Sequence, residues 1–213
     1  MPGGWAWDDD DETAPQRRAR ENGARQIACA LQMIATALAE GRCQVDDAML
    51  CTLHRLAMDG LIAAPGTIRV DDVVIRGSAH EPPAWQRVRG QLDELYAYVN
   101  QPHHDAVHTA AYALWRINWI HPFAPDGNGR VARAVALVLL FARLRRMPSA
   151  KVGRPTFLHR LLQRKYPYLD ALEASDAACA RAAIDVTALE TLLVEVLWEH
   201  LDDGSDSGDG ALP

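Results

Sequence analysis

The sequence predicts an all-α fold, a bundle of helices with one small β-hairpin. Apolar residues recur at three- and four-residue steps through most of the chain, which is the period of a helix that buries one face. Between Gly66 and Gly77 the pattern changes to two short runs rich in β-branched residues, TIRV and VVI, separated by two aspartates. Paired runs of this kind between glycines indicate a hairpin at residues 67–78.

Two amphipathic helices are expected before the hairpin. The first covers residues 17–40, and its inward-facing residues are Ile27, Leu31, Ile34 and Leu38. The second covers residues 46–58, and its inward-facing residues are Met49, Leu50, Leu53, Leu56 and Ala57.

Helical spacing returns after Pro82 and Pro83. It predicts a helix at 85–100, whose apolar positions are Val88, Leu92, Leu95 and Val99. A central helix is expected at 105–120, and another from about Gly129 to residue 146. Proline and glycine then interrupt the chain before helices at 156–164, 167–180 and 187–201.

One domain at residues 17–201 follows from this pattern, because 213 residues suit a single domain of ordinary size. The flanking segments, 1–16 and 202–213, are acidic, hold Gly and Pro or Ser, and lack periodicity. We expect both to be disordered tails.

Composition limits the classes of function. The formal net charge is −6, from 22 basic and 28 acidic residues, so a nucleic-acid groove is not expected. The four cysteines form no CxxC pair, which favours reduced thiols in a cytoplasmic protein. The start of the chain does not resemble a signal peptide, and the most apolar stretch, 132–142, is too short to span a bilayer.

The segment 121–133, HPFAPDGNGRVAR, combines residue types that favour a phosphate site. Gly127 and Gly129 let the backbone turn several N–H groups toward one point, and the helix that follows adds the positive end of its dipole. Arg130 and Arg133 lie one turn apart, and both are expected to reach an anion held over the helix start.

Asp126 and His121 complete a reactive arrangement. A carboxylate beside a phosphate implies a hard cation such as Mg²⁺, which one carboxylate and substrate phosphates can hold. A neutral imidazole near the phosphorus can take a proton from an incoming hydroxyl. The parts together are typical of phosphoryl or nucleotidyl transfer.

Each of these residues also has an ordinary structural interpretation. A Gly-Asn-Gly run is often a turn, and His121 could simply end a helix. Arg130 and Arg133 could lie on a solvated helix face, and Phe123 is expected in the core under either interpretation. The conjunction of base, cation ligand, glycines and arginines favours the functional one.

These residues carry a family resemblance. IHPFAPDGNGRVAR resembles the signature of bacterial Fic-domain proteins, H-x-F-x-[DE]-G-N-G-R-x-x-R. Other segments are similar to members of the family in the same order, and the resemblance covers roughly residues 20–200: ARENGARQI, LHRLAMDG, GTIRVDDVVIRGSAHEPP, AAYALWRINWIHPF and YLDALEASDAA.

The resemblance implies an all-α Fic fold and a protein adenylyltransferase. Such an enzyme transfers AMP from ATP, with Mg²⁺, to the hydroxyl of a Ser, Thr or Tyr of a target protein. His121 would be the base, Phe123 would hold the loop in the core, and Asp126 would bind Mg²⁺. The nucleotide phosphates would be bound by Gly127, Asn128, Gly129, Arg130 and Arg133, with Arg133 reaching the terminal one.

The resemblance also gives the hairpin a role. It would be the family's flap, which pairs with an extended stretch of the target and aligns its hydroxyl. Ile75, Arg76 and Gly77 in the flap are assigned to nucleotide binding. The partners implied are therefore ATP and a protein substrate. No nucleic acid or membrane is expected as a partner, and a homodimer is compatible with the resemblance.

One departure from the signature lies between Phe123 and Gly127. The family has two residues there, and this chain has three: Ala124, Pro125 and Asp126. A misplacement of about 1 Å in such a site can lower the rate about 100-fold. Three outcomes are open: the loop bulges and keeps transfer, it leaves a nucleotide-binding regulatory module with weak or lost transfer, or the site removes AMP or transfers another phosphate-bearing group.

A self-inhibitory glutamate is a further question. Many family members carry a helix with the pattern [ST]-x-x-x-E-[GN], whose Glu pairs with the second motif arginine. Thr36, Glu40 and Gly41 match this pattern, although Glu40 is also a reasonable last residue of an ordinary helix that ends at Gly41. Glu21 and Asn22 match it in part, with Arg17 in place of Ser or Thr.

Overall fold

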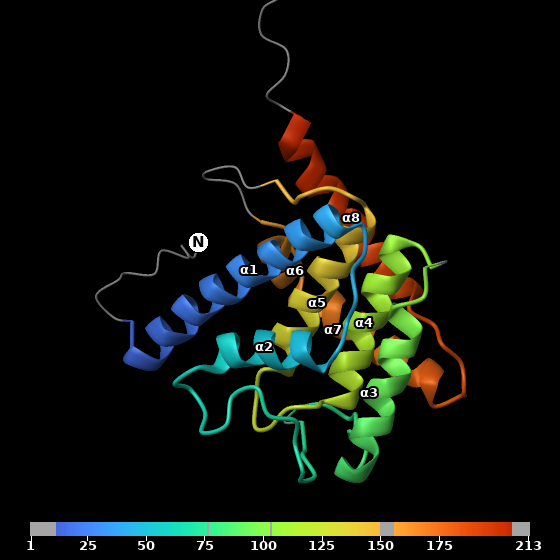
Figure 1. Cartoon of the computed structure of the whole chain (residues 1–213). Coiled ribbons are helices and arrows are strands. Elements are labelled where there is room, and N and C mark those ends of the chain that lie inside the picture. The colour runs from blue at the N-terminus through green and yellow to red at the C-terminus, as the bar shows by residue number, and fades with distance from the viewer. Residues whose placement is uncertain (1–11, 76, 103, 150–155, 206–213) are drawn as a thin grey trace, which may run out of the picture.

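The computed structural model describes residues 12–75, 77–102, 104–149 and 156–205 (Figure 1). Within these ranges the chain forms helices joined by loops, as the sequence predicts. The helices are α1 Ala14–Glu40, α2 Asp47–Met58, α3 Trp85–Val99, α4 Ala106–Ile120, α5 Asn128–Arg143, α6 Phe157–Gln163, α7 Lys165–Cys179 and α8 Thr187–Ser205.

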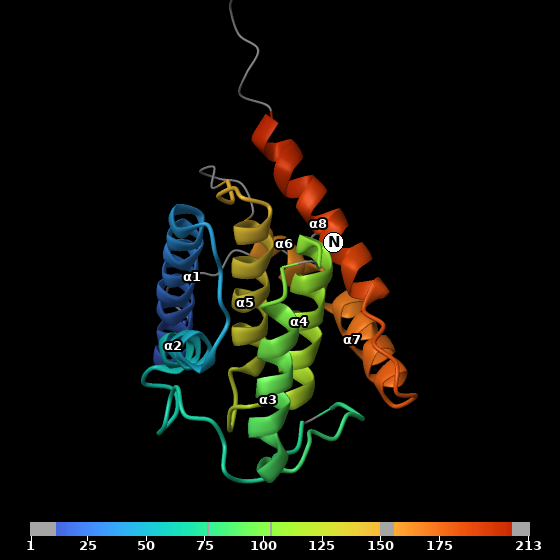
Figure 2. The same ribbon diagram turned by 45° about the vertical axis from the view of Figure 1, so that its right-hand side comes forward.

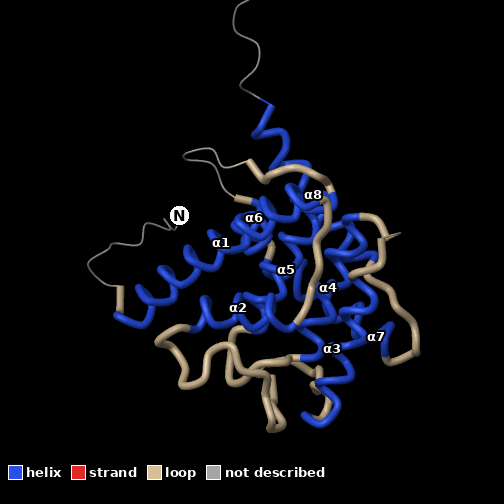
Figure 3. The backbone as a smooth tube through the Cα atoms, viewed as in Figure 1, coloured by secondary structure: helices blue, strands red, loops and turns tan. Residues whose placement is uncertain are grey.

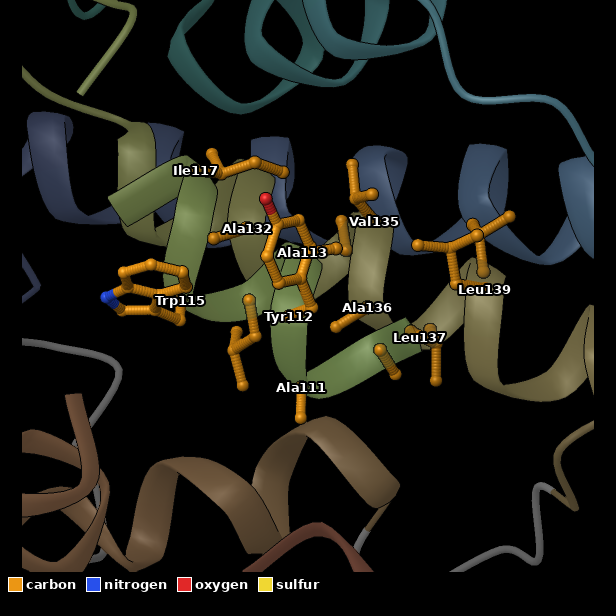
Figure 4. Packing of buried hydrophobic residues seen from close by; sticks show 14 of the residues in the cluster. Ala111, Tyr112, Ala113, Trp115, Ile117, Ala132, Val135, Ala136, Leu137 and Leu139 are labelled. Atoms are coloured by element: carbon orange, nitrogen blue, oxygen red, sulfur yellow. The ribbon is translucent and has the colours of Figure 1, made fainter. Parts of the chain in front are cut away.

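Helices α4 and α5 form the centre of the bundle. The close-up in Figure 4 shows side chains of both helices in one cluster, which includes Tyr112, Trp115 and Ile117 from α4 and Val135 and Leu139 from α5. Both helices are buried around most of their circumference, which explains why their sequences are apolar with little one-sided pattern. Each large apolar side chain buried here stabilises the fold by about 1.5–3 kcal/mol.

The other helices cover this centre on two sides. Helices α1 and α2 pack against α5, whereas α3 packs against α4. Helices α6, α7 and α8 form the opposite side, and α8 contacts α4, α6 and α7. The view in Figure 2 separates these layers, with α1 and α2 on one side of α5 and α4, and α7 and α8 on the other.

Helix ends follow from local sequence. Thr13 and Gln16 form a capping box, so α1 begins at Ala14, three residues before the expected start. Asp46 and Asp105 each accept a hydrogen bond from the third residue of the helix that follows. Gly41 ends α1 in the left-handed conformation, with φ of 71°.

The expected hairpin at 67–78 is the main difference from the sequence prediction. Its described residues contain no strand ladder, and Figure 3 draws this region as loop. The one β-bridge among them joins Ile68 to Phe123, outside the segment. Two strands alone are marginally stable in water, and here the buried Arg69 side chain binds backbone carbonyls that hold the base of the segment in another way.

Several further predictions concern the ends and the composition of the chain. The expected tails were too long, because residues 14–16 belong to α1 and residues 202–205 belong to α8. Residues 1–11 and 206–213 lie outside the described residues, so disorder there remains a prediction. The four cysteines are free thiols, as expected. No helix in the described part of the chain combines the length and the apolar character needed to cross a membrane.

Candidate active site

The predicted phosphate loop joins the last residue of α4 to the first residue of α5. It lies at the same end of the molecule as the long connection between α2 and α3, at the bottom of Figure 1. His121 begins the loop in the left-handed conformation, with φ of 52°, and its backbone N–H donates to the carbonyl of Ile117. The chain therefore leaves α4 sharply at His121.

The imidazole of His121 is held in one orientation. Its Nδ1 lies 3.1 Å from the carbonyl oxygen of Asn118, so Nδ1 carries the proton and donates it. The lone pair of Nε2 then remains available. Burial lowers the pKa of His121 below its ordinary value, and the nearby Arg69 adds to this, while the bond to Asn118 opposes it. The ring is therefore neutral near pH 7, as a general base requires.

Arg69 fixes the backbone at this turn. Its side chain is buried, its Nε donates to the carbonyl of His121 at 2.8 Å, and its Nη2 lies 3.3 Å from the carbonyl of Ile120. Its backbone N–H donates to the carbonyl of Pro122 at 2.9 Å. The guanidinium also binds the carbonyls of Asp71 and Pro83. One side chain thus connects the first part of the flap segment, and Pro83 beyond the segment, to the end of α4.

Phe123 and Asn128 close the loop around the extra residue. The side-chain amide of Asn128 accepts from the N–H of Phe123 at 2.9 Å and donates to its carbonyl at 2.8 Å. Both residues are buried, whereas Pro125 between them is exposed, after a cis peptide bond from Ala124. The insertion therefore bulges toward solvent while the two ends of the loop stay together.

His54 on α2 packs against the loop. Its ring stacks on Phe123 with 3.9 Å between centroids and 5° between planes. The N–H of Gly66 donates to Nδ1 at 2.8 Å, so the proton lies on Nε2, which donates to the carbonyl of Asp126 at 2.9 Å. Burial lowers the pKa of His54, and the bond to Asp126 opposes that shift.

The start of α5 offers backbone donors. Gly127 is its N-cap with φ of 101°, and no side chain caps the helix. The first N–H groups of a helix have no partner within it, and together with the dipole they favour an anion. A Cβ at Gly127 would come within 2.7 Å of the His54 ring, so glycine is required here by both conformation and space.

Asp126 is placed to share a cation with such an anion. It is exposed, and one carboxylate oxygen accepts from the N–H of Gly127 at 2.6 Å. The other oxygen lies 3.9 Å from the guanidinium of Arg130. Within the described residues no three His, Cys, Asp or Glu side chains come together to hold a metal. A single exposed carboxylate fits Mg²⁺ only in the form it takes with substrate phosphates and water.

The side chains of the two arginines, one turn apart on α5, have different partners. Arg130 turns toward the end of α2, where its Nη1 lies 3.3 Å from the carbonyl of Ala57. Arg133 turns toward Gly129, where a Cβ would come within 3.2 Å of its guanidinium. It also interacts with the hydroxyl of Tyr168. Arg133 thus lies over the helix start, and Arg130 lies beside it.

Asn118 connects these groups. Its carbonyl binds the His121 ring, and its side-chain amide donates to the carbonyl of Leu114 and to the hydroxyl of Tyr168. Tyr168 is buried, which raises its pKa, while Arg133 and Asn118 act in the opposite direction. A single turn of α4 therefore orients both the base and the environment of Arg133.

The flap residues assigned to nucleotide binding are only partly described. The N–H of Ser78 donates to the carbonyl of Ile75, and Gly77 has φ of 76°. Arg76 lies outside the described residues. The assignment of all three to nucleotide binding remains a prediction.

The structure separates the two glutamates considered as inhibitors. Gly41, next to Glu40, lies near Arg145, beyond the C-terminal end of α5. Arg133 lies about 15 Å along α5 from the C-terminal end of that helix. The Glu40 carboxylate lies 3.5 Å from Arg42 instead, so it does not pair with Arg133. Glu21 is exposed near the loop end, where the neighbouring Asn22 binds the carbonyls of Ala57 and Asp59.

Sequence reasoning identified the contiguous loop and missed three residues that hold it: His54, Arg69 and Asn118. His54 lies on the buried face of a helix, where a lone histidine resembles an ordinary core residue. The partners of Arg69 are backbone carbonyls, which no side-chain pattern reveals. Asn118 has one signal, its position one turn before His121 on the same helix.

Comparison with known proteins identifies this arrangement. Residues 44–140, from before α2 to near the end of α5, match the model of the Fic/DOC family. The segment that holds the candidate site is therefore similar to a Fic/DOC domain. No protein of curated function matches the sequence.

Solved structures of Fic proteins share the fold. A Fic family protein from Desulfovibrio desulfuricans is 22% identical with a TM-score of 0.58, and the match covers 93% of this chain and 69% of that one. A fragment of Fic-1 from C. elegans is 17% identical with a TM-score of 0.68, covering 93% and 55%. A Fic domain containing signaling protein from Bacteroides thetaiotaomicron is 18% identical with a TM-score of 0.62, covering 90% and 75%.

Fic proteins are generally transferases of phosphate-containing groups such as AMP, and ATP is their general substrate. The identities to the solved structures are low, so these structures support the fold and not a particular substrate. The specific reaction has to be argued from the residues of this chain.

Proposed function

We propose that this Fic protein transfers AMP from ATP to a hydroxyl group of a target protein. The observation that carries the proposal is the orientation of His121. Its Nδ1–H donates to the Asn118 carbonyl, which leaves the Nε2 lone pair for a substrate, and the loop that His121 begins leads to the start of α5, which no side chain caps. A base and an anion site in this relation suit the attack of a hydroxyl on a phosphate.

The transfer step balances with the residues at hand. Nε2 of His121 takes the proton of the target hydroxyl, and the oxygen forms a bond to the α-phosphorus of ATP. The bond from that phosphorus to the bridging oxygen of the β-phosphate breaks, and pyrophosphate leaves. The N–H groups of Gly127, Asn128 and Gly129 and the side chains of Arg130 and Arg133 stabilise the phosphate oxygens.

Asp126 would hold Mg²⁺ against these phosphates, and the bound cation would neutralise part of their charge. The proximity of Asp126 to Arg130 supports this arrangement, because the two side chains offer a cation site and an anion site next to each other. Arg133, over the helix start, is assigned to the terminal phosphate.

The flap segment is the proposed docking site for the protein substrate. Two of its apolar side chains are exposed, Val70 at 65% and Val74 at 90%, although the rest of the segment is anchored through Arg69. Exposed apolar residues in a segment with no strand partner could accept an added segment of target chain. The anchor to His121 would bring the target hydroxyl toward the base.

Labelled ATP tests the reaction directly. Purified protein with Mg²⁺ and a cell lysate is expected to transfer label from the α-phosphate of ATP to protein, and not from the γ-phosphate. The variant His121→Ala is expected to bind ATP but to transfer nothing. Transfer of γ-label would show phosphorylation instead, and equal transfer by both forms would remove His121 as the base. ATP binding without any transfer would favour a nucleotide-binding regulatory module.

A further inference from the structure

His54 links two segments that both border the candidate site. It is fully buried, with 0% exposure, on α2. On one side its Nδ1 accepts from Gly66, which precedes the flap segment, and on the other its Nε2 donates to the carbonyl of Asp126. The two bonds leave from different ring positions, so each partner is fixed relative to the other.

The hydrogen bond to the Asp126 carbonyl orients the whole peptide group between Asp126 and Gly127. The carbonyl of Asp126 and the N–H of Gly127 belong to the same planar peptide group, so fixing one fixes the direction of the other. That N–H, which donates to the Asp126 carboxylate in this structure, is the first of the backbone donors assigned to the proposed phosphate nest. The His54 ring also lies against Gly127, since a Cβ there would meet its Cδ2 and Nε2 at 2.7 Å.

This hydrogen bond lies directly after the residues that lengthen the loop. Ala124 and Pro125 supply the extra length of the loop, and Asp126 is the residue that follows them. Asn128 closes the loop at Phe123 and at the helix start, but only His54 among the described side chains donates a hydrogen bond to the Asp126 carbonyl between them. The hydrogen bond from His54 thereby fixes the lengthened loop at Asp126, where the backbone enters the proposed phosphate nest.

We propose that His54 is a positioning residue for the nucleotide phosphates, acting through its Nε2–H bond to the carbonyl of Asp126. The proposal rests on the proposed function in that it takes the start of α5 as the phosphate site. It differs from a purely structural role because it assigns the effect to one of the two ring nitrogens.

Two amide variants separate the two nitrogens. In His54→Gln the side-chain amide nitrogen can occupy the place of Nε2 and donate to Asp126. In His54→Asn the amide oxygen can occupy the place of Nδ1 and accept from Gly66, but nothing reaches Asp126. Both variants lose the stacked ring and keep one hydrogen bond, so they form a matched pair in stability.

Calorimetric titration with ATP and Mg²⁺ provides the first comparison. We expect His54→Asn to bind ATP about tenfold more weakly than His54→Gln, the effect of about one hydrogen bond. We also expect thermal unfolding to give similar stabilities for the two variants. Equal ATP affinities, or affinities that follow stability alone, would overturn the proposal.

Hydrogen exchange gives a readout that needs no transfer and no ATP. Amides of residues 124–130 are expected to exchange faster in His54→Asn than in His54→Gln or the unsubstituted protein. If the unsubstituted protein binds ATP but transfers no label, the proposed function fails while these two comparisons still decide the role of His54. If it binds no ATP, exchange alone decides, and equal exchange in both variants contradicts the proposal.

The unsubstituted protein supplies a test if neither variant folds. Nitrogen NMR of the histidine rings distinguishes the two neutral tautomers. We expect the proton of His54 on Nε2 and that of His121 on Nδ1. A proton on Nδ1 of His54 would be incompatible with both bonds described here and would refute the proposal.

Discussion

The side-chain amide of Asn128 satisfies both the N–H and the carbonyl of Phe123, five residues before it. This pair of hydrogen bonds spans the extra residue of the loop, so the distance between the end of α4 and the start of α5 does not depend on how Ala124 and Pro125 are arranged. The departure from the family signature is therefore taken up in an exposed bulge.

Replacing Asn128 with Ala tests this closure. It would leave two buried backbone groups of Phe123 without partners, at a cost of about 2–4 kcal/mol in the free energy of unfolding. ATP affinity should fall as well, because the loop opens. Urea unfolding and calorimetry measure the two effects.

Asn100 provides the matched control. Its side-chain amide binds the N–H and the carbonyl of Val45 in the same way, away from the loop. Asn100→Ala should lower stability to a similar degree and leave ATP affinity unchanged in the folded protein. Equal effects of the two variants on ATP affinity would mean that closure by Asn128 has no specific role in the site.

Arg69 is expected to act on the rate and not on ATP binding. Its guanidinium holds the carbonyls of Ile120 and His121, so Arg69→Lys should displace the base while leaving the start of α5 in place. A displacement of about 1 Å would lower kcat about 100-fold. Steady-state kinetics with labelled ATP would show this as a fall in kcat with little change in KM for ATP.

The control for Arg69 is another arginine whose hydrogen-bond acceptors are backbone carbonyls. The Arg143 guanidinium donates to the carbonyls of Val99, Gln101 and His104 at the far end of α5. Arg143→Lys should reduce stability without changing kcat. A fall in kcat that is as large for Arg143→Lys would assign the effect of Arg69 to general destabilisation.

Gly127→Ala should damage both the fold and the nest. The residue would carry a Cβ at φ of 101° and within 2.7 Å of His54, so we expect a loss of about 3 kcal/mol or more in unfolding free energy. Gly41→Ala is the control, because Gly41 also has a positive φ of 71° but its nearest neighbour is a flexible Arg145 side chain at 3.7 Å. It should cost about 1–2 kcal/mol. Equal losses would show that the contact with His54 is unimportant.

The sequence predicted buried residues best where helical spacing alone determines which side chains face the core. The helix α3 has one buried face, and its buried residues are the four expected from spacing: Val88, Leu92, Leu95 and Val99. The hairpin prediction was wrong because β-branched runs indicate extended backbone but not its partner, and Ile68 pairs with Phe123 instead.

The same limit applies to predicting the site, because sequence spacing does not reveal contacts between distant segments. The residues from His121 to Arg133 are contiguous, so their chemistry could be read together. His54 and Asp126 are 72 positions apart, and their contact arises only when α2 and α5 pack together. The different partners of Arg130 and Arg133 were also beyond a spacing rule, because they depend on Ala57 in one case and on Tyr168 in the other.

Stability is expected to fall as pH decreases below neutrality. Burial is the first cause that lowers the pKa values of His54, His121 and His200 in the folded protein below the ordinary 6.5. Between the folded and unfolded pKa values the unfolded chain binds more protons, so the free energy of unfolding rises with pH in that window. The stability that these neutral histidines contribute is complete above about pH 7. Below that pH, each histidine adds a slope of at most about 1.4 kcal/mol per pH unit to the free energy of unfolding.

Urea unfolding at pH 7.5, 6.5 and 5.5 measures this slope. Asp47, whose pKa is lowered from 3.8, titrates below this range and contributes little to it. The variant His54→Gln has one fewer titrating group and should show a smaller loss between pH 6.5 and 5.5 than the unsubstituted protein. An unchanged slope in this variant would mean that His54 is not held in its neutral form by the fold, and that the hydrogen bond from Gly66 to its Nδ1 does not persist in solution.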